Sequence, residues 1–238
     1  PEEDAAALDT PATPVQPGHG NVDIAVIRLP HIANFDDFAP LAAEPGITVR
    51  YVSSLATLGQ PHAVILPGTK STIADLLWLR EQGLAPAIQH LAQAGTVVVG
   101  ICGGYQMLGR HIKDPLGVES TLPEVAGLAL LPVETVFEPT KATYQAEARI
   151  LRGPGWLAVL HDQTIQGYEI HMGRTPSQQP WLEISQRNGV RLAMADGAVT
   201  AAGNVRGCYL HGVFANESLR RAWLTSLGWH GDPVRGSA

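Results

Sequence analysis

One stretch near the middle of the chain, VVVGICGGYQMLG at residues 97–109, constrains the fold more than any other. Its run of β-branched residues predicts a buried strand, and the segment from Tyr105 to Leu108 predicts the first turn of a helix. The glycines on either side of Cys102 allow a sharp strand-to-helix turn that a Cβ atom would obstruct, so we expect the thiol to project beside a helix N-terminus. The helix dipole favours thiolate over thiol there. We interpret the stretch as a nucleophile elbow; the alternative is a buried structural cysteine beside a glycine-rich turn.

The composition narrows the class of protein. A chain of 238 residues that is 45% hydrophobic and 16% charged is long enough for one large domain or two small ones. Its net charge of −6, with Lys and Arg scattered along the sequence, argues against nucleic-acid and anionic-membrane partners. No run approaches ~18 apolar residues and the chain does not open on a signal-peptide pattern, so we expect a cytoplasmic protein without a membrane segment.

Cysteine usage excludes a disulfide framework, because Cys102 and Cys208 are the only 2 cysteines in the chain. A zinc site formed by both thiols with His171 and His211 is conceivable. It is disfavoured because no CxxC or HExxH spacing supports it, and we expect no bound metal.

Local composition and hydrophobic patterning divide the chain into regions. Residues 1–20 are rich in Pro, Ala and acidic residues and lack a periodic apolar face, which predicts an interdomain linker and implies a domain upstream. Residues 21–230 are predicted to form one domain and residues 231–238 a C-terminal tail. In the first half of the domain we expect strands at 22–29, 47–52, 63–66 and from Val97 onward, and helices at 35–42, 72–81 and 84–94. This alternation predicts a parallel, doubly wound sheet covered on both faces.

The second half has a different pattern, with short alternating runs that predict strands joined by turns. These runs lie at 128–137, 144–151, 164–171, 182–185, 191–195, 198–202 and 205–210. A final helix is predicted at 216–227, with Leu219, Trp223 and Leu227 on one face. We therefore expect one domain whose second half adds further strands to the first.

A reactive thiolate needs a base, and 9 histidines are available. His211 follows a predicted strand, and the ends of strands line the crevice of a doubly wound sheet, so His211 is one candidate. The rival is His171, which shares a strand face with Glu169 because side chains repeat every two residues. Each has a plainer interpretation: His211 as a strand-end histidine bonded to the backbone, and the Glu169–His171 pair as a solvated strand face.

The turn PGTKST at residues 67–72 lies between a predicted strand and a predicted helix, so its amides are free to bind an anion. It lacks the spacing of a P-loop, which disfavours phosphate. It could form an oxyanion hole together with the Gly103 amide. It could also be a simple turn in which Ser71 or Thr72 caps the helix.

Several of these features occur in the order that is typical of class I (triad-type) glutamine amidotransferases: Pro67-Gly68, the Cys102 elbow and a late His211. Three longer stretches, RLPHIANFDDF at 28–38, GYEIHMGRT at 167–175 and YLHGVF at 209–214, resemble the glutaminase half of the cobyric acid synthases. The resemblance covers about residues 21–230, and Pro1–Ala5 is similar to the family's interdomain linker. It implies a flavodoxin-like, three-layer α/β sandwich with a mostly parallel central sheet and extra strands in its second half.

The resemblance also implies roles for individual residues. Cys102 would be the nucleophile and His211 the general base, with the oxyanion held at Gly68 and Gly103. Gln106 matches a position that helps to bind substrate glutamine.

One departure from the class concerns the residue two places after the histidine, where a carboxylate is usual and this chain has Val213. The cobyric acid branch also lacks that acid, so a Cys–His pair is expected without an identified orienting group. Glu169 is the candidate for that role or for glutamine recognition.

For function, the resemblance implies glutamine hydrolysis that supplies ammonia for the ATP-dependent amidation of adenosylcobyrinic acid a,c-diamide, a corrinoid of cobalamin biosynthesis. ATP and Mg²⁺ would act in an N-terminal synthetase domain that this chain lacks, and no cofactor is expected in the glutaminase domain itself. Two alternatives remain: the glutaminase subunit of a lipid II amidotransferase, and a non-catalytic module that binds a corrinoid or a synthetase partner.

Overall fold

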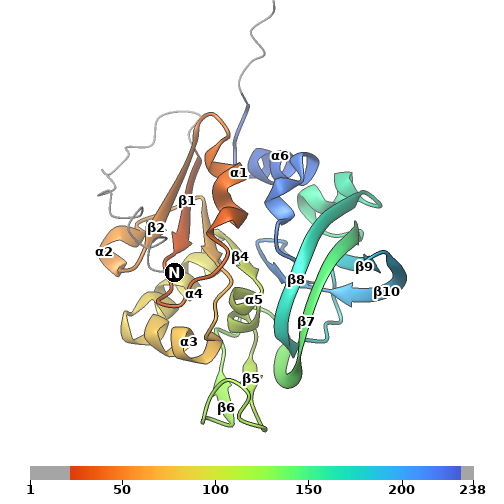
Figure 1. Ribbon diagram of the computed structural model, residues 1–238. Helices are drawn as coiled ribbons and strands as arrows, with labels where there is room; N and C mark the ends of the chain where they lie inside the picture. Colours follow the sequence, from red (N-terminus) through yellow and green to blue (C-terminus); the bar gives the residue numbers. More distant parts are fainter. Residues whose placement is uncertain (1–21, 232–238) are drawn as a thin grey trace, which may run out of the picture.

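A six-stranded sheet forms the centre of the computed structural model, which describes residues 22–231 (Figure 1). The predicted linker at 1–20 lies outside the described residues, as does the predicted tail after its first residue. The sheet order is β11 (Ala198–Val199), β12 (Val205–Cys208), β4 (Val97–Ile101), β3 (Ala63–Leu66), β1 (Val22–Ile27) and β2 (Ile47–Val52). All pairings are parallel except that of β11 with β12. The predicted parallel sheet is therefore confirmed.

The helices follow the strands as the first half of the sequence predicts. They are η2 (Phe35–Phe38), α1 (Ala39–Ala42), α2 (Leu55–Leu58), α3 (Thr72–Glu81), α4 (Leu84–Gln93), α5 (Gly103–Leu108), η3 (Gly155–Leu160), η4 (Val213–Ala215) and α6 (Glu217–Ser226). Every residue of β3 is buried, because this central strand is covered on both faces and is apolar throughout. The short helices α2, η3 and η4 were not predicted.

Most strands of the second half form a separate sheet and do not extend the first, which corrects the simplest expectation from the sequence. Its order is β10 (Val190–Asp196), β9 (Leu182–Arg187), β7 (Glu134–Ile150), β5 (His111–Lys113) and β6 (Glu124–Ala126), with β8 (Thr164–Arg174) also paired to β7. In Figure 1, β7 and β8 form a long curved hairpin to the right of the first sheet.

Strand β7 joins two strands that the sequence predicts separately, at 128–137 and 144–151. The strand contains Pro139, which cannot donate a ladder hydrogen bond and is typical of a strand end. Here the chain continues through a register shift between Phe137 and Ala142 in its pairing with β8, so the break is a local irregularity within one strand. The segment 128–133 lies outside any strand.

The two sheets meet where β8 contacts the segment that follows β12. Tyr168 and His211 form an isolated antiparallel bridge, in which the His211 amide donates to the Tyr168 carbonyl at 2.8 Å. Strand β8 therefore passes the carboxyl end of the first sheet, where the ligand site of a doubly wound sheet is formed.

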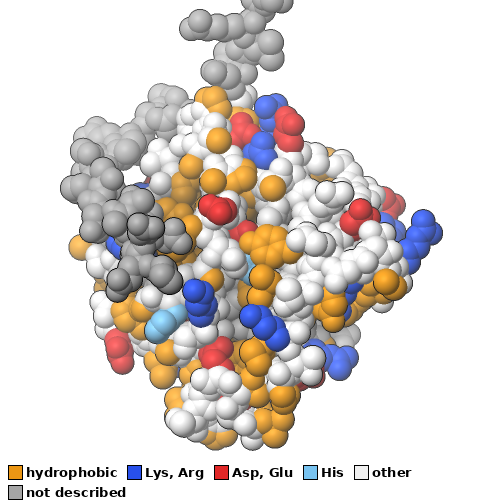
Figure 2. Space-filling model, viewed as in Figure 1, with side chains coloured by type: hydrophobic (Ala, Val, Ile, Leu, Met, Phe, Trp, Pro, Cys, Tyr) orange, Lys and Arg blue, Asp and Glu red, His pale blue; other side chains and the backbone are white. Residues whose placement is uncertain are grey.

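On the face seen in Figure 2, Lys and Arg side chains are interspersed with Asp and Glu and do not gather into one basic patch. Among residues 22–231, no helix has the length and apolar character needed to span a membrane.

Candidate active site

Cys102 stands alone between the end of β4 and the start of α5, with backbone angles φ 51° and ψ −109°. A non-glycine residue rarely adopts a positive φ, so this conformation is strained and is typical of a functional turn. The turn requires Gly104, because a Cβ atom there would lie 1.9 Å from the Leu66 carbonyl oxygen. The helix begins at Gly103, two residues before the predicted Tyr105. The strand–turn–helix geometry of the predicted elbow is present.

His211 lies directly beside Cys102, and both residues border Gly68. A Cβ atom added at Gly68 would lie 2.8 Å from Cε1 of His211 and 3.7 Å from Cβ of Cys102. The imidazole is buried, and the Cys102 side chain is close enough to help raise its pKa. The Cys102 Sγ atom is also 3.3 Å from the Ile170 carbonyl oxygen, which can accept a bond from the thiol. The structure thus brings together two residues that are far apart in sequence.

The carboxylate that contacts His211 is Asp37, a residue that sequence reasoning did not single out. Its Oδ2 accepts from Nδ1 of His211 at 2.7 Å, and its Oδ1 accepts from the Gly212 amide at 3.0 Å. Burial lowers the pKa of His211, but the bonds to Asp37 and Cys102 and their negative charges outweigh it and raise the pKa to about 10. Asp37 lies on η2 within the stretch 28–38 that carried the family resemblance, so the signal was present although its role was not recognised.

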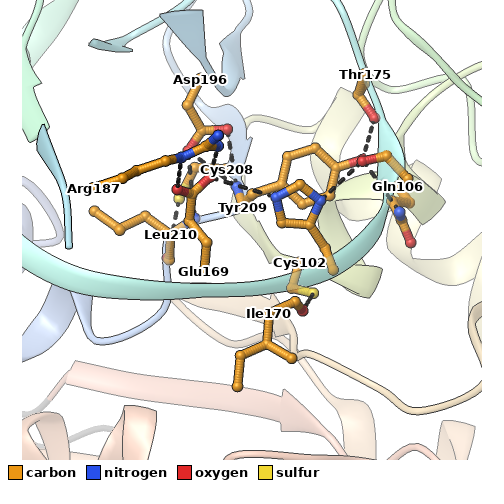
Figure 3. A network of polar contacts seen from close by, with 12 residues as sticks. Cys102, Gln106, Glu169, Ile170, Thr175, Arg187, Asp196, Cys208, Tyr209 and Leu210 are labelled. Carbon is orange, nitrogen blue, oxygen red and sulfur yellow. Dashed lines mark hydrogen bonds and ion pairs between the residues drawn. The ribbon is translucent and has the colours of Figure 1, made fainter. Parts of the chain in front are cut away.

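Glu169 does not orient His211, and that part of the sequence-based hypothesis is wrong. Its carboxylate accepts two bonds from Arg187, from Nε at 2.6 Å and from Nη2 at 2.7 Å, and the side chain is only 1% exposed (Figure 3). Burial raises the pKa of Glu169, but the bonds from His171 and Arg187 outweigh this effect and lower it. The predicted proximity of Glu169 and His171 is confirmed, at 3.4 Å.

His171, the rival base, belongs to this second cluster. Its ring stacks on Tyr209 with a centroid distance of 3.9 Å, and Nδ1 lies 2.9 Å from the Gly173 carbonyl oxygen. Within the described residues, its hydrogen-bond partners are Glu169 and Gly173.

The turn at residues 67–72 faces the elbow. A Cβ atom at Gly103 would lie 2.6 Å from Cγ2 and 3.3 Å from the backbone nitrogen of Thr69, so the turn and the elbow are in close contact. Within residues 22–231 the amides of Gly68 and Gly103 donate no backbone hydrogen bond, whereas Gly104 donates to Pro67 at 3.1 Å. Ser71 occupies the N-cap position of α3 but its side chain makes no capping bond. The simple capping interpretation is therefore not supported, and two amides remain available near the Cys102 thiol.

Gln106 is buried on α5, and both ends of its amide are bonded. Its Oε1 accepts from Thr72 at 3.0 Å, and its Nε2 donates to the Tyr209 hydroxyl at 3.2 Å. The same hydroxyl lies 2.6 Å from Oγ1 of Thr175 (Figure 3). This chain of bonds ties the elbow helix to the turn before α3 and to the end of β8. Contact with substrate glutamine stays a prediction.

The other free cysteine has a different environment. Cys208 is completely buried on β12, and burial holds the pKa of its thiol well above the usual value, so the thiolate is disfavoured. No group of three or more metal-ligating side chains occurs in the described part of the chain.

A parallel α/β sheet that presents a cysteine on a strained turn, next to a histidine–carboxylate pair and two unpaired amides, has the architecture of a class I glutamine amidotransferase. Two solved structures share this fold. One is described as "Structure of PurLQS from Thermotoga maritima" and matches with a TM-score of 0.64 and 18% sequence identity. The match covers 87% of this chain and 99% of the solved chain. The other, described as a glutamine amidotransferase, has a TM-score of 0.57 and 16% identity and covers 86% of this chain and 97% of its own.

The chain belongs to the CobB/CobQ-like glutamine amidotransferase domain family, whose model matches residues 23–219. A curated relative from Roseiflexus castenholzii, named cobyric acid synthase, is 49% identical over 233 residues. The match covers 97% of this chain but 45% of the relative, so the chain spans about half the length of that protein.

Proposed function

We propose that this domain hydrolyses glutamine to glutamate and ammonia, with Cys102 as nucleophile and His211 as the acid and base. The observation that carries the proposal is the position of Cys102 on a strained turn, beside an imidazole that Asp37 holds at 2.7 Å. With a pKa of about 10, His211 is a cation at neutral pH and stabilises the Cys102 thiolate.

In the first half of the reaction the thiolate attacks the side-chain carbonyl carbon of glutamine, and the carbonyl π electrons move to oxygen. The Gly68 and Gly103 amides, unpaired within the described residues, are suited to donate to this oxyanion. The tetrahedral intermediate then collapses as the carbon–nitrogen bond breaks. His211 gives its proton to the leaving nitrogen, and ammonia departs from a thioester on Cys102.

In the second half, neutral His211 removes a proton from water as the oxygen attacks the thioester carbon. The carbon–sulfur bond breaks, glutamate leaves, and the thiolate–imidazolium pair is restored. Asp37 keeps Nδ1 as the protonated nitrogen, so Nε2 is the one that exchanges protons with substrate. Gln106 and Glu169 are the candidates for recognition of substrate glutamine.

The ammonia would be consumed by a second activity. The curated relative named cobyric acid synthase is about twice the length of this chain, which supports a synthetase domain as the partner. There, ATP and Mg²⁺ would activate carboxylates of adenosylcobyrinic acid a,c-diamide for amidation. We place the domain in cobalamin biosynthesis on this basis; the identity of the acceptor distinguishes it from a lipid II amidotransferase.

The test is glutamate release by the domain joined to its synthetase partner and supplied with ATP. We expect Cys102→Ala to reduce turnover by at least ~10⁴-fold, because no other group forms the thioester. The matched control is Cys208→Ala, which removes the buried thiol and should leave turnover nearly unchanged. Absence of glutamate release by the unmodified chain would favour the non-catalytic alternative, and turnover in Cys102→Ala close to that of the unmodified chain would exclude Cys102 as nucleophile.

A further inference from the structure

Tyr168 on β8 makes three contacts with the candidate base His211 and its carboxylate partner Asp37. Its ring lies nearly parallel to the imidazole of His211, with a centroid distance of 5.0 Å and an interplanar angle of 9°. Its backbone pairs with that of His211 through bonds of 2.8 Å and 3.3 Å. Its hydroxyl donates to Oδ1 of Asp37 at 3.4 Å. The side chain of Tyr168 therefore contacts both His211 and Asp37.

The surroundings of Tyr168 do not explain the ring as a filler of the core. The residue is half-buried, and it lines a surface hollow of about 430 Å³ together with Gln145, Gln166 and Gln186. A ring that serves only to fill space is enclosed by apolar side chains, whereas this one lies between an imidazole and an open hollow. The contacts that the structure shows for its ring and hydroxyl are those with His211 and Asp37.

We propose that Tyr168 is a positioning residue for His211, whose ring fixes the plane of the imidazole toward Cys102 and whose hydroxyl restrains Asp37. The proposal rests on the proposed glutaminase function, which gives His211 its role. Because β8 belongs to the second sheet, Tyr168 makes that sheet part of the catalytic apparatus at the edge of the first sheet.

The stack has an electrostatic consequence. The face of an aromatic ring carries partial negative charge and attracts a cation, so the phenol ring favours imidazolium over neutral imidazole. The groups that face His211 are Asp37 from η2, Cys102 from the elbow and the neutral amide of Asn34, whose nitrogen lies 3.4 Å from Nδ1. Asp36 adds negative charge near Tyr168. Loss of the ring should therefore lower the pKa of His211, while Asp37 and Cys102 continue to raise it.

The experiment compares Tyr168→Leu, which removes the ring, with Tyr168→Phe, which removes only the hydroxyl. The His211 pKa is measured by NMR titration of its ring protons, and kcat/KM for glutamine is measured across pH. We expect Tyr168→Leu to lower the His211 pKa by about one unit and kcat/KM by ~10-fold, and Tyr168→Phe to leave the pKa nearly in place with a loss of ~2-fold. Tyr51→Leu is the matched control, since Tyr51 is a half-buried tyrosine of β2 whose ring contacts Phe35.

The NMR readout separates this inference from the proposed function. An unchanged His211 pKa in Tyr168→Leu, whatever its rate, would overturn the positioning role even if the domain is a glutaminase. A lowered pKa in a chain that releases no glutamate would support the contact between Tyr168 and His211 while the proposed function fails. Should Tyr168→Leu not fold, Tyr168→Met supplies an unbranched side chain without a ring and carries the same expectation.

Discussion

Two histidine–carboxylate pairs within the described residues, the buried His211–Asp37 pair and the part-buried His171–Glu169 pair, differ in how the chain forms them. Glu169 and His171 are two residues apart on one strand, and their contact follows from the period of the strand. Asp37 and His211 are 174 residues apart and meet only because η2 and the end of β12 reach the same edge of the sheet. In the second pair, the Cys102 thiol helps to raise the pKa of the imidazole.

The groups that surround each histidine–carboxylate pair decide what the pair can do. Arg187 reaches across β7 and neutralises Glu169, so the local pair ties β8 to β9 and has no charge left for catalysis. Asp37 is bonded to His211 and the Gly212 amide, so its negative charge sustains an imidazolium next to Cys102. The comparison indicates that closeness in sequence predicts contact between a histidine and a carboxylate, whereas the surrounding charge determines its role.

The strongest test of this comparison is Asp37→Asn. An amide cannot sustain the imidazolium, so we expect kcat/KM to fall by ~10³-fold, in the range of general acid–base contributions. Because Asp37 and Cys102 together raise the pKa of His211 to about 10, loss of Asp37 should move the alkaline limb of the pH profile downward, toward the ordinary value of 6.5. Asp36→Asn makes the same change in net charge at an exposed neighbouring position and should retain most of the activity. Equal effects of the two variants would argue against a specific role for Asp37.

The next largest effect is expected from Gly68→Ala. The added Cβ atom would lie 2.8 Å from Cε1 of His211, which displaces either the imidazole or the turn that carries the oxyanion donor. Loss of one such donor typically costs ~10²-fold in kcat. Gly95→Ala is the control, since Gly95 has φ 98° with nothing within 4 Å, so the substitution should lower the melting temperature and leave turnover intact. A Gly68→Ala enzyme with normal turnover would exclude this turn from the site.

Sequence reasoning recovered the first half of the fold well because its signals are local. Strands Ile47–Val52 and Ala63–Leu66 and the helix Thr72–Glu81 have the predicted bounds, and each is delimited by a glycine, a proline or a polar turn. The elbow at Cys102 was equally readable from its glycines, and the structure requires Gly100 and Gly104 through backbone contacts of less than 3 Å.

The rest of the site could not be derived in that way. The pairing of β7 with β8 and the return of β12 to the first sheet are long-range events, and they place Tyr168 and Asp37 against His211. The sequence around Asp37 contains two adjacent aspartates, and only the fold distinguishes the buried one from its exposed neighbour. Glu169 was favoured because it lies near a histidine in sequence, while its true partner Arg187 lies on another strand.

The Arg187→Met variant tests the Glu169–His171 pair, and we expect it to change stability more than catalysis. Removal of the guanidinium leaves the 1%-exposed carboxylate of Glu169 without its main partner, which should cost about 3 kcal/mol in the free energy of unfolding. The pKa of Glu169 is lower in the folded chain than in the unfolded chain, so the ionised carboxylate stabilises the fold at pH values above the unfolded-state pKa. This stabilisation is lost as the pH falls through the folded-state pKa. We expect the Arg187→Met variant to lack this pH-dependent stabilisation. Urea unfolding at several pH values measures both effects.

The double variant Arg187→Met with Glu169→Gln should recover part of that loss, since the buried charge is then gone. Glu169→Gln alone also tests the predicted role of Glu169 in glutamine recognition, which requires a rise in KM for glutamine. A rise in KM without a change in stability would assign the carboxylate to substrate, whereas the reverse result would leave it a purely structural group.

The smallest effect is expected from His171→Phe, which keeps a ring to stack on Tyr209 and removes only polar contacts. The lost bonds to Glu169 and to the Gly173 carbonyl should cost about 1 kcal/mol of stability, because Glu169 retains Arg187. Turnover should stay within ~3-fold of the parent, while the matched change His211→Phe should remove it, since of the two histidines it is His211 that bonds Asp37 and interacts with Cys102. A loss in His171→Phe as large as that in Asp37→Asn would show that the two pairs act as one network through Tyr209, in which case the local pair would have to be counted within the catalytic site.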